Sequence, residues 1–396
     1  MYGTGALWLR DAEAMDAQER EIPTVGVEEE YFLVDPVTRS VVSAGPRVVA
    51  RAVLEVGDLV SEEFTGYQIE VKTRPCTTMG ELRAELVRVR AAAVSAAGQE
   101  GLRLCASGTP VTAPVDQAPD VGDHPRYRAG LKQYRAMLDD FDISAFHAHV
   151  YLPDREQAVL AGNHLRPWLP LLVALSANSP FHHGIDTGYA SWRSVIRSRF
   201  PCLGPPPYAR SLAHHEQLAA AMAASEAMLN AGMPYWDIRP HPHLPTLEVR
   251  SMDVLTDVDD TVALTALIRA TVVTVAHRVE EGDRGPQVCS ELLRAAYWRA
   301  ARDGWTGSGI DVLTATPMSF ADQAAQLVAY VRPVLERYND LDLVKTFLAR
   351  LNTRGSGADL QHSWNGTQAG LHAVVDGLIQ ATTSPSIKGT EPLTVQ

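Results

Sequence analysis

Short segments in which apolar and polar residues alternate are concentrated in the first two-thirds of the chain. Each is rich in β-branched or aromatic residues and is bounded by Gly, Pro or Asp, a pattern typical of β-strands. The segments are TVGVEEEYFLV (24–34), GYQIEVKTR (66–74), LRLCASG (102–108), ISAFHAHVYL (143–152), YWDIRPH (235–241) and TLEVRSM (246–252). We therefore expect several short strands.

Apolar residues at helical spacing fill the regions between and after these segments. Thr78 and Glu81 form a capping-box signature before one such run, and residues 211–231 and 257–281 are expected to be helices. Residues 290–381 are expected to be almost wholly helical. The order is neither a strict strand–helix alternation nor all-β, so we predict an α+β fold with one antiparallel-rich sheet and helices packed on one face.

Alternation also gathers polar side chains, because residues i and i+2 of a strand share a face. Five of the predicted strands have one polar or charged face and one apolar face. The polar sets are Glu28 with Glu30, Gln68 with Glu70 and Lys72, His147 with His149, Asp237 with Arg239, and Glu248 with Arg250. Glu29 points to the opposite face, so the substitution Glu29→Gln is expected to be mild.

Two interpretations of the polar face are open. Solvated faces are common in antiparallel sheets, but they favour Lys, Thr, Ser and Gln, whereas Glu, His, Arg and Asp dominate here. Clustered carboxylates are tolerated when cations neutralise them, and oxygen ligands select Mg²⁺ or Mn²⁺. Such metals hold phosphate groups while Arg holds the transferred phosphoryl group or a carboxylate. The polar face therefore predicts a metal-dependent phosphoryl-transfer site.

The His147-x-His149 pair allows another interpretation, because an HxH pair also opens the metal site of many amidohydrolases. In that class the pair normally lies on the first strand of a barrel, whereas here it follows residue 140. The chain contains no P-loop sequence GxxxxGK[ST] and no kinase signature set. ATP would therefore be held by a different architecture.

Composition limits the expected binding partners of the protein and its expected cellular compartment. The 396 residues carry a net charge of −12, which argues against nucleic acid because backbone binding needs a basic face. No apolar run reaches the roughly 20 residues that span a bilayer, and the first residues lack the pattern of a signal peptide. The four cysteines lie far apart without a CxxC pair. We expect a cytoplasmic protein without a membrane partner.

Several of these segments together resemble the carboxylate–amine ligases related to type 2 glutamate–cysteine ligase. The matching stretches are GVEEEYFLVDPVTR, YQIEVKTRPCTTMGELR, FHAHVYLPDREQAV, LVALSANSPFHHGIDTGYASWRSVIRSRFP, YWDIRPHPHLPTLEVRSMDV and YWRAARDGWTG, in the family's order from about residue 22 to about residue 310. The resemblance implies a glutamine-synthetase-like (glutamine synthetase/guanido kinase-like) fold with a curved antiparallel sheet. It also implies that ATP activates a carboxylate as an acyl phosphate, which an amine attacks to form an amide, and that the protein is a homodimer.

The resemblance also implies roles for residues of the polar face. The metal ligands would be Glu28, Glu30, Glu70, His147 and Glu248. His149 would lie near the nucleotide phosphates, and Arg193 would be a weaker nucleotide contact. Arg239 and Arg250 would clamp the γ-phosphate and the substrate carboxylate. The cofactors would be ATP with Mg²⁺ or Mn²⁺, and the substrates a small carboxylic acid, such as glutamate or another amino acid, and an amine such as cysteine.

The resemblance also sets the expected division of the chain and leaves one departure. Residues 1–22 would be a flexible segment, residues 23–382 a single ligase domain with a helical C-terminal third, and residues 383–396 a disordered tail.

Family members often carry an Arg-Gln pair in the C-terminal helical segment, where this chain has RGSGADLQHSWNGTQAG. That segment is expected to lie over the site. Its change leaves open an altered substrate, or a nucleotide or amino-acid binder without activity.

Overall fold

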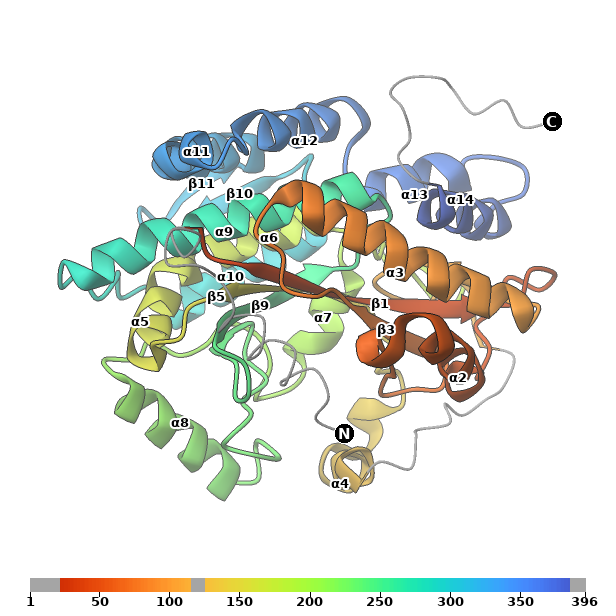
Figure 1. Ribbon diagram of the computed structural model, residues 1–396, viewed down its shortest axis with the longest axis horizontal. Helices are drawn as coiled ribbons and strands as arrows, with labels where there is room; N and C mark the ends of the chain where they lie inside the picture. The colour runs from red at the N-terminus through yellow and green to blue at the C-terminus, as the bar shows by residue number, and fades with distance from the viewer. Residues whose placement is uncertain (1–21, 115–124, 385–396) are drawn as a thin grey trace.

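The centre of the protein, in a computed structural model that describes residues 22–114 and 125–384, is a seven-stranded sheet (Figure 1). The strands are β1 (Val25–Val34), β2 (Val60–Glu62), β3 (Gln68–Lys72), β4 (Arg103–Cys105), β5 (Ala145–Tyr151), β8 (Ile238–Pro240) and β9 (Thr246–Asp253). Their order is β2-β3-β1-β5-β9-β8, and β4 pairs with the end of β1 that extends past β3. All pairs are antiparallel. The predicted antiparallel-rich sheet is confirmed. Of the predicted terminal segments 1–22 and 383–396, residues 1–21 and 385–396 lie outside the described residues.

One face of the sheet is apolar and is covered by helices. The covering helices are α3 (Met79–Gln99), α5 (Arg155–Leu165), α6 (Leu169–Ser176) and α9 (Val258–Glu280). Val27, Phe146 and Val249, which alternate with the polar residues of their strands, are at most 1% exposed. Burying side chains of this size stabilises the fold by about 1.5–3 kcal/mol each. The helices α11 (Phe320–Arg337) and α12 (Leu341–Arg354) form a further layer outside α9 (Figure 1).

The two best-defined helix predictions are confirmed. Thr78 Oγ1 accepts a hydrogen bond from the backbone N–H of Glu81 at 3.1 Å, and the Glu81 carboxylate accepts one from the N–H of Thr78 at 3.0 Å, so the capping box begins α3. The predicted helix 257–281 is α9. Among the described residues, α9 is the one helix that is long and apolar enough to cross a membrane. However, 78% of its apolar stretch is buried inside the protein, as in a core helix.

The remaining elements lie around this core. They are α2 (Gly45–Val56), α4 (Pro125–Tyr134), α7 (Trp192–Ser198), α8 (Leu212–Ala224), α10 (Ser290–Asp303), α13 (Gly357–Asn365), α14 (Leu371–Thr383), the short helices η2 (Gly57–Leu59), η3 (Arg135–Leu138) and η4 (Arg166–Trp168), and the strand pairs β6 (Phe181–His182) with β7 (Ile185–Asp186) and β10 (Ser308–Asp311) with β11 (Thr316–Ser319). The C-terminal third is helical apart from the β10–β11 hairpin.

The helix predicted over 211–231 is shorter than expected. It ends at Ala224, and Glu226 adopts a φ of +57°, which a right-handed helix cannot continue. The backbone oxygen of Glu226 accepts a hydrogen bond from the side chain of Gln133 in α4. A contact with a distant segment thus ends a run of residues whose own preference is helical.

Glu29 lies on the covered face of β1, as alternation predicts, but it is not a mild position. Its side chain is fully buried. Arg90 of α3 donates to both carboxylate oxygens, at 2.8 Å from Nε and 2.5 Å from Nη2, and Thr261 of α9 donates at 2.8 Å. The hydroxyl of Tyr31 is a further donor. Because Glu29→Gln would leave a buried guanidinium without its counter-charge, the expectation of a mild substitution is corrected.

Candidate active site

The sheet order makes the five polar sets neighbours. Glu28 of β1 lies opposite Lys72 of β3 on one side and opposite His147 of β5 on the other. Glu30 is paired with Glu70, His149 with Glu248, and Arg239 with the same Glu248. Side chains that are up to about 220 positions apart in the sequence therefore meet on one face of the sheet, which spacing within single strands could not establish.

This face forms the floor of a cavity of about 570 Å³. The residues that line it include Glu28, Glu30, Glu70, Lys72, His147, Arg193, Arg239 and Arg250 from the predicted site, together with aromatic residues from α4 and from the segments around residues 64, 141 and 200. The predicted polar face is thus a recess and not a flat, solvated surface. A cavity with a few convergent polar groups is the usual form of a small-molecule site.

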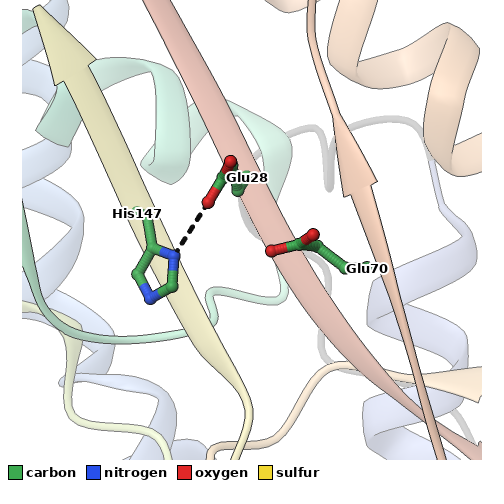
Figure 2. A group of neighbouring side chains, drawn as sticks. All are labelled: Glu28, Glu70 and His147. Carbon is green, nitrogen blue, oxygen red and sulfur yellow. Dashed lines mark hydrogen bonds and ion pairs between the residues drawn. The ribbon is translucent and has the colours of Figure 1, made fainter. Parts of the chain in front are cut away.

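Glu28, Glu70 and His147 form the first group that could hold a metal ion (Figure 2). One ligand atom from each lies within 4.8 Å of the others. The Nδ1 atom of His147 is 3.1 Å from Oε2 of Glu28. Two carboxylates and one imidazole from three adjacent strands form a donor set in which oxygen predominates, which suits Mg²⁺ or Mn²⁺.

Two further groups share ligands with the first one. Glu28 also forms a group with His149 and Glu248, and Glu70 forms one with Glu30 and Glu63. The Nε2 atom of His149 lies 3.7 Å from Oε1 of Glu28. All five predicted metal ligands therefore belong to these groups. His149, which was expected near the nucleotide phosphates, is itself a member of one of these candidate metal groups, with Glu28 and Glu248.

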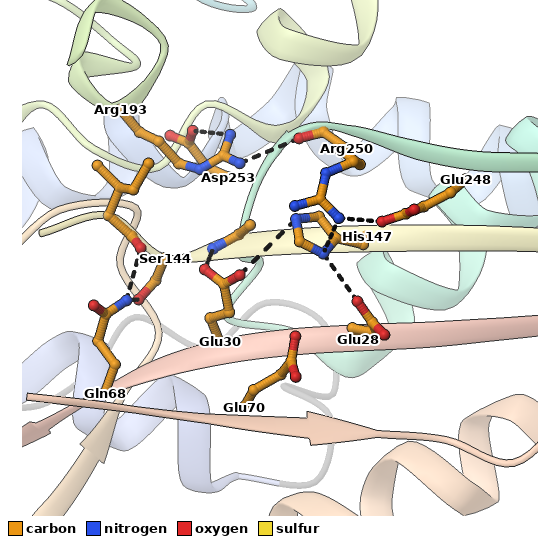
Figure 3. Close-up of polar contacts among 12 residues, drawn as sticks. Glu28, Glu30, Gln68, Glu70, Ser144, His147, Arg193, Glu248, Arg250 and Asp253 are labelled. Carbon is orange, nitrogen blue, oxygen red and sulfur yellow. Dashed lines mark hydrogen bonds and ion pairs between the residues drawn. The ribbon is translucent and has the colours of Figure 1, made fainter. Parts of the chain in front are cut away.

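Arg239 and Arg250 both donate to Glu248. Figure 3 shows the contact between Arg250 and Glu248. Arg239 donates from Nε to Oε2 of Glu248 at 2.7 Å and also donates to the backbone oxygen of Pro234. Arg250 donates to the other oxygen of the same carboxylate, and its Nη1 lies 3.4 Å from Nδ1 of His147. The two guanidinium groups thus border the metal-ligand groups and line the cavity.

Arg193, on α7, is fully buried at another part of the cavity wall. Its guanidinium donates to the backbone oxygens of Arg250 and Ser251, both at 3.2 Å, and lies 3.7 Å from Asp253 (Figure 3). Burial lowers the pKa of Arg193 to about 10. Because its donors hold the end of β9, Arg193 supports the strand that carries Glu248 and Arg250.

The carboxylates of the site divide into two kinds by their pKa. Burial and the nearby Glu70 raise the pKa of Glu30 to about 7, and burial also raises the pKa of Glu70. For Glu63, burial together with Glu30 and Glu70 raises the pKa well above its ordinary value. These three acids form one of the candidate metal groups. Glu70 pairs with Lys72 at 2.6 Å, but burial and the mutual repulsion of the three acids outweigh this positive charge, which is the situation that a bound cation relieves.

The other carboxylates already have positive neighbours. Burial raises the pKa of Glu28, but His149, His147 and Lys72 more than offset this and hold it well below its ordinary value. Glu248 is likewise held low, because Arg239 and Arg250 outweigh its burial. Burial and Arg250 lower the pKa of His147 to about 3. His147 is therefore neutral at physiological pH, the form in which imidazole binds a metal.

Alternation within strands missed Glu63, and it did not show that Gln68 and Asp237 use their polar groups for other contacts. Glu63 lies in the bend between β2 and β3, and the signal that could have found it is only its acidic neighbour Glu62. Gln68 shares the polar face, but its amide is used for bonds to the backbone of Ile143 and the hydroxyl of Ser144. Asp237 precedes β8 and binds Arg197 and Tyr297, so it does not join the metal groups.

The C-terminal segment does not lie over the cavity, which corrects the prediction. None of the described residues of α13 and α14 lines it. Gln361 is fully buried and donates to Oδ1 of Asn178 at 2.8 Å, while α14 packs beside β4 at the far end of β1 (Figure 1). The missing Arg-Gln pair is therefore no evidence about the part of the site that the structure describes.

Sequence comparison finds relatives along most of the chain. Residues 24–359 match the glutamate-cysteine ligase family 2 (GCS2). A protein of Mycobacterium sp. (strain KMS), provisionally named glutamate–cysteine ligase 2-2, is 39% identical over 361 residues, 91% of this chain and 98% of its own. A protein of Nocardia farcinica (strain IFM 10152), provisionally named glutamate–cysteine ligase 2-1, is 41% identical over 362 residues, 91% of this chain and 94% of its own.

Solved structures share the fold at low identity. The crystal structure of glutamate–cysteine ligase from Francisella tularensis in complex with AMP has a TM-score of 0.69 and 12% identity, over 92% of this chain and 89% of that one. A bifunctional glutathione synthetase from Pasteurella multocida has a TM-score of 0.65 and 13% identity, over 96% of this chain and 53% of that one. The α+β fold is confirmed, and the sequence match shows that the chain belongs to the glutamate–cysteine ligase family 2.

Proposed function

We propose that this protein is an ATP-dependent ligase that joins a small carboxylic acid, glutamate or another amino acid, to an amine such as cysteine. The observation that carries this proposal is the juxtaposition of three linked metal-ligand groups with two arginines at one recess of the sheet. Family membership and the AMP complex of a structural neighbour support nucleotide use.

The reaction would proceed in two steps. The carboxylate oxygen of the acid attacks the γ-phosphorus of ATP, which forms an acyl phosphate and releases ADP. The nitrogen of the amine then attacks the acyl carbon, the bond to phosphate breaks, and the amide and inorganic phosphate are formed after loss of a proton from nitrogen. Phosphoryl transfer of this kind depends on positioning and charge neutralisation more than on a nucleophilic side chain.

The residues fit a divalent cation. Glu28, Glu30, Glu63, Glu70, His147, His149 and Glu248 would hold Mg²⁺ or Mn²⁺ in the shared groups. A bound cation would supply positive charge that neutralises the phosphate oxygens. Arg239 and Arg250 border these groups and present donors that match phosphate or carboxylate geometry. They would orient the γ-phosphate and the acid so that the attacking oxygen and the phosphorus are in line.

The test is product formation from defined mixtures. The purified protein is incubated with ATP, Mg²⁺ and pools of amino acids and amines, and ADP, phosphate and new amides are measured by mass spectrometry. We expect one acid–amine pair to give all three products in equal amounts. The proposal is wrong if no pair releases ADP. Nucleotide binding without turnover would indicate a non-catalytic binder, and ATP-independent hydrolysis with bound zinc would indicate a metal hydrolase.

Two variants link turnover to the site. Glu70→Gln removes a carboxylate that belongs to two of the metal groups and should abolish ADP release. Glu55→Gln, on the exposed side of α2, is the matched control and should leave turnover unchanged. Loss of activity in both variants, or in neither, would remove the assignment of the metal site.

A further inference from the structure

A second cavity, of about 860 Å³, adjoins the active cavity. It lies between α7, α10 and the segment 199–207. Arg197, Phe200 and Leu203 line both cavities, so they form the wall that the two share. The function proposed above assigns no role to this second space.

One buried arginine in the wall of this cavity has no counter-charge. Six arginines of the described chain are buried, and five of them have a carboxylate oxygen within 4 Å. These pairs are Arg90 with Glu29, Arg193 with Asp253, Arg197 with Asp237, Arg239 with Glu248, and Arg269 with Asp340. Arg166 is only 2% exposed, and no carboxylate of the described residues forms an ion pair with it.

The hydrogen bonds of Arg166 are also incomplete. Its Nε donates to the backbone oxygen of Pro206 at 2.8 Å, while Nη1 is buried and has no hydrogen-bond partner among the described residues. Burial lowers the pKa of Arg166. A buried guanidinium is costly unless a negative group and hydrogen-bond acceptors compensate it. Arg166 therefore retains the capacity to bind an anion.

The acids nearest to this wall are already used. Asp237 accepts hydrogen bonds from Arg197 and from the hydroxyl of Tyr297, at 3.0 Å for the latter. Glu291 accepts a bond from Cys289. Asp237 is thus committed to buried partners, and Glu291 is exposed to solvent, so neither acid that lines the cavity compensates Arg166.

Most of the remaining wall is apolar. Trp236 and Leu293 are buried beside the cavity, and Trp298 is 49% exposed at the surface of α10. Arg197 and Arg199 also line the cavity but pair with Asp237 and Asp140, and Arg294 is exposed to solvent, so Arg166 is the buried cation of this wall without a carboxylate partner among the described residues. Such a wall fits a molecule with one negative charge and an apolar body. A phosphate ion or a highly charged nucleotide would leave much of this wall unused, because apolar surface contributes to binding only when it is covered.

We propose that this cavity is a second binding site, for a small carboxylic acid with an apolar body whose carboxylate pairs with Arg166. The site is separate from the ligase centre but shares the Arg197 wall with it. The missing counter-charge of Arg166 is supplied by the ligand in the same way as Asp340 supplies that of Arg269.

Calorimetric titration of the full chain with matched probes tests this site. The probes are phenylacetate and hexanoate, the neutral analogue phenylacetamide, and inorganic phosphate. We expect saturable binding of at least one acid at a single site, and at least about tenfold weaker binding of the amide, because the neutral amide cannot supply the counter-charge of Arg166. Arg166→Met should weaken acid binding by a similar factor, and Arg166→Lys should retain part of it.

Two further variants keep the test decisive. Val195→Trp fills the cavity without changing Arg166 and should abolish acid binding even if Arg166→Met does not fold. Glu28→Gln changes only the active cavity and should leave acid binding intact. The proposal is overturned if no acid binds saturably, if acid and amide bind equally, or if folded Arg166→Met or Val195→Trp binds as the unaltered protein does. Loss of acid binding in Glu28→Gln would also overturn it, because the acid would then occupy the ligase centre.

Discussion

Three consecutive glutamates on β1 show how the two faces of one sheet treat the same side chain. Glu29 points to the covered face, where Arg90, Thr261 and Tyr31 satisfy both of its oxygens. Glu28 and Glu30 point into the recess, where further acids lie close to them. The pKa of Glu30 is about 7 because burial and Glu70 disfavour its charge.

The difference between Glu29 and Glu30 lies in how far neighbouring positive groups compensate the carboxylate. Donors within the chain satisfy both carboxylate oxygens of Glu29. These contacts join β1 to α3 and α9 and leave no free acceptor for a ligand. The negative charges of the acids around Glu30 are not fully compensated within the chain, so these acids can bind a cation. Arg90 and Arg166 show the same contrast for positive charge, since only Arg90 has a carboxylate partner.

The largest expected effect is on the covered face. Glu29→Gln should lower the free energy of unfolding by about 3–5 kcal/mol, because it leaves Arg90 buried and unpaired. Chemical denaturation measures this loss, and turnover per folded molecule should stay near that of the unaltered protein. The double variant Glu29→Leu with Arg90→Met should recover most of the stability. A mild effect of Glu29→Gln would show that water can reach this pair.

The next largest effect is on the open face. Glu28→Gln should lower turnover by about 100-fold to 1,000-fold, comparable to the loss of another preorganised electrostatic group, while unfolding changes little. Steady-state ADP release at saturating Mg²⁺ checks this, with denaturation as the second measurement. If Glu28→Gln unfolds the protein and spares turnover, the two faces do not differ as described.

A smaller effect concerns pH. The folded pKa of Glu30, about 7, lies above its ordinary value of 4.5, so the metal-free protein loses stability as pH rises from the lower to the higher value. Mg²⁺ must displace this proton, so its affinity should fall by up to about tenfold per unit as pH drops below about 7. Titration of Mg²⁺ at about pH 6 and about pH 8 measures this dependence. In Glu30→Gln this dependence should weaken, and the remainder should come from Glu63 and Glu70, whose pKa values are also raised.

The smallest effect serves as a reference for exposed charge. Arg332 and Glu336 form an exposed pair at 2.7 Å on α11. Arg332→Ala should change the free energy of unfolding by less than about 0.5 kcal/mol, since solvent screens such pairs. Chemical denaturation of the Arg332→Ala and Glu29→Gln variants under the same conditions measures both changes in the free energy of unfolding. A loss similar to that of Glu29→Gln would mean that burial is not what makes the Glu29–Arg90 pair important.

The sequence predicted six of the seven strands of the central sheet and which residues share a face, because alternation is a local property of the chain; it missed the short β2. It did not predict Glu63, which lies in a bend without periodicity, or the early end of α8, which depends on a contact with Gln133. The position of α14 beside β4 and of α13 against Asn178 likewise depends on distant packing, such as the bond between Gln361 and Asn178.

The sequence by itself determined that Glu28, Glu30, Glu70, His147 and Glu248 stand on polar strand faces and that Glu29 does not. Only the tertiary structure decided that these faces are adjacent, in the order β3-β1-β5-β9-β8, and that Glu28 is shared by two metal groups. The physical reason is that side-chain direction follows from the local pleat of a strand. Charge compensation depends on which strands and helices the whole fold brings within a few ångströms.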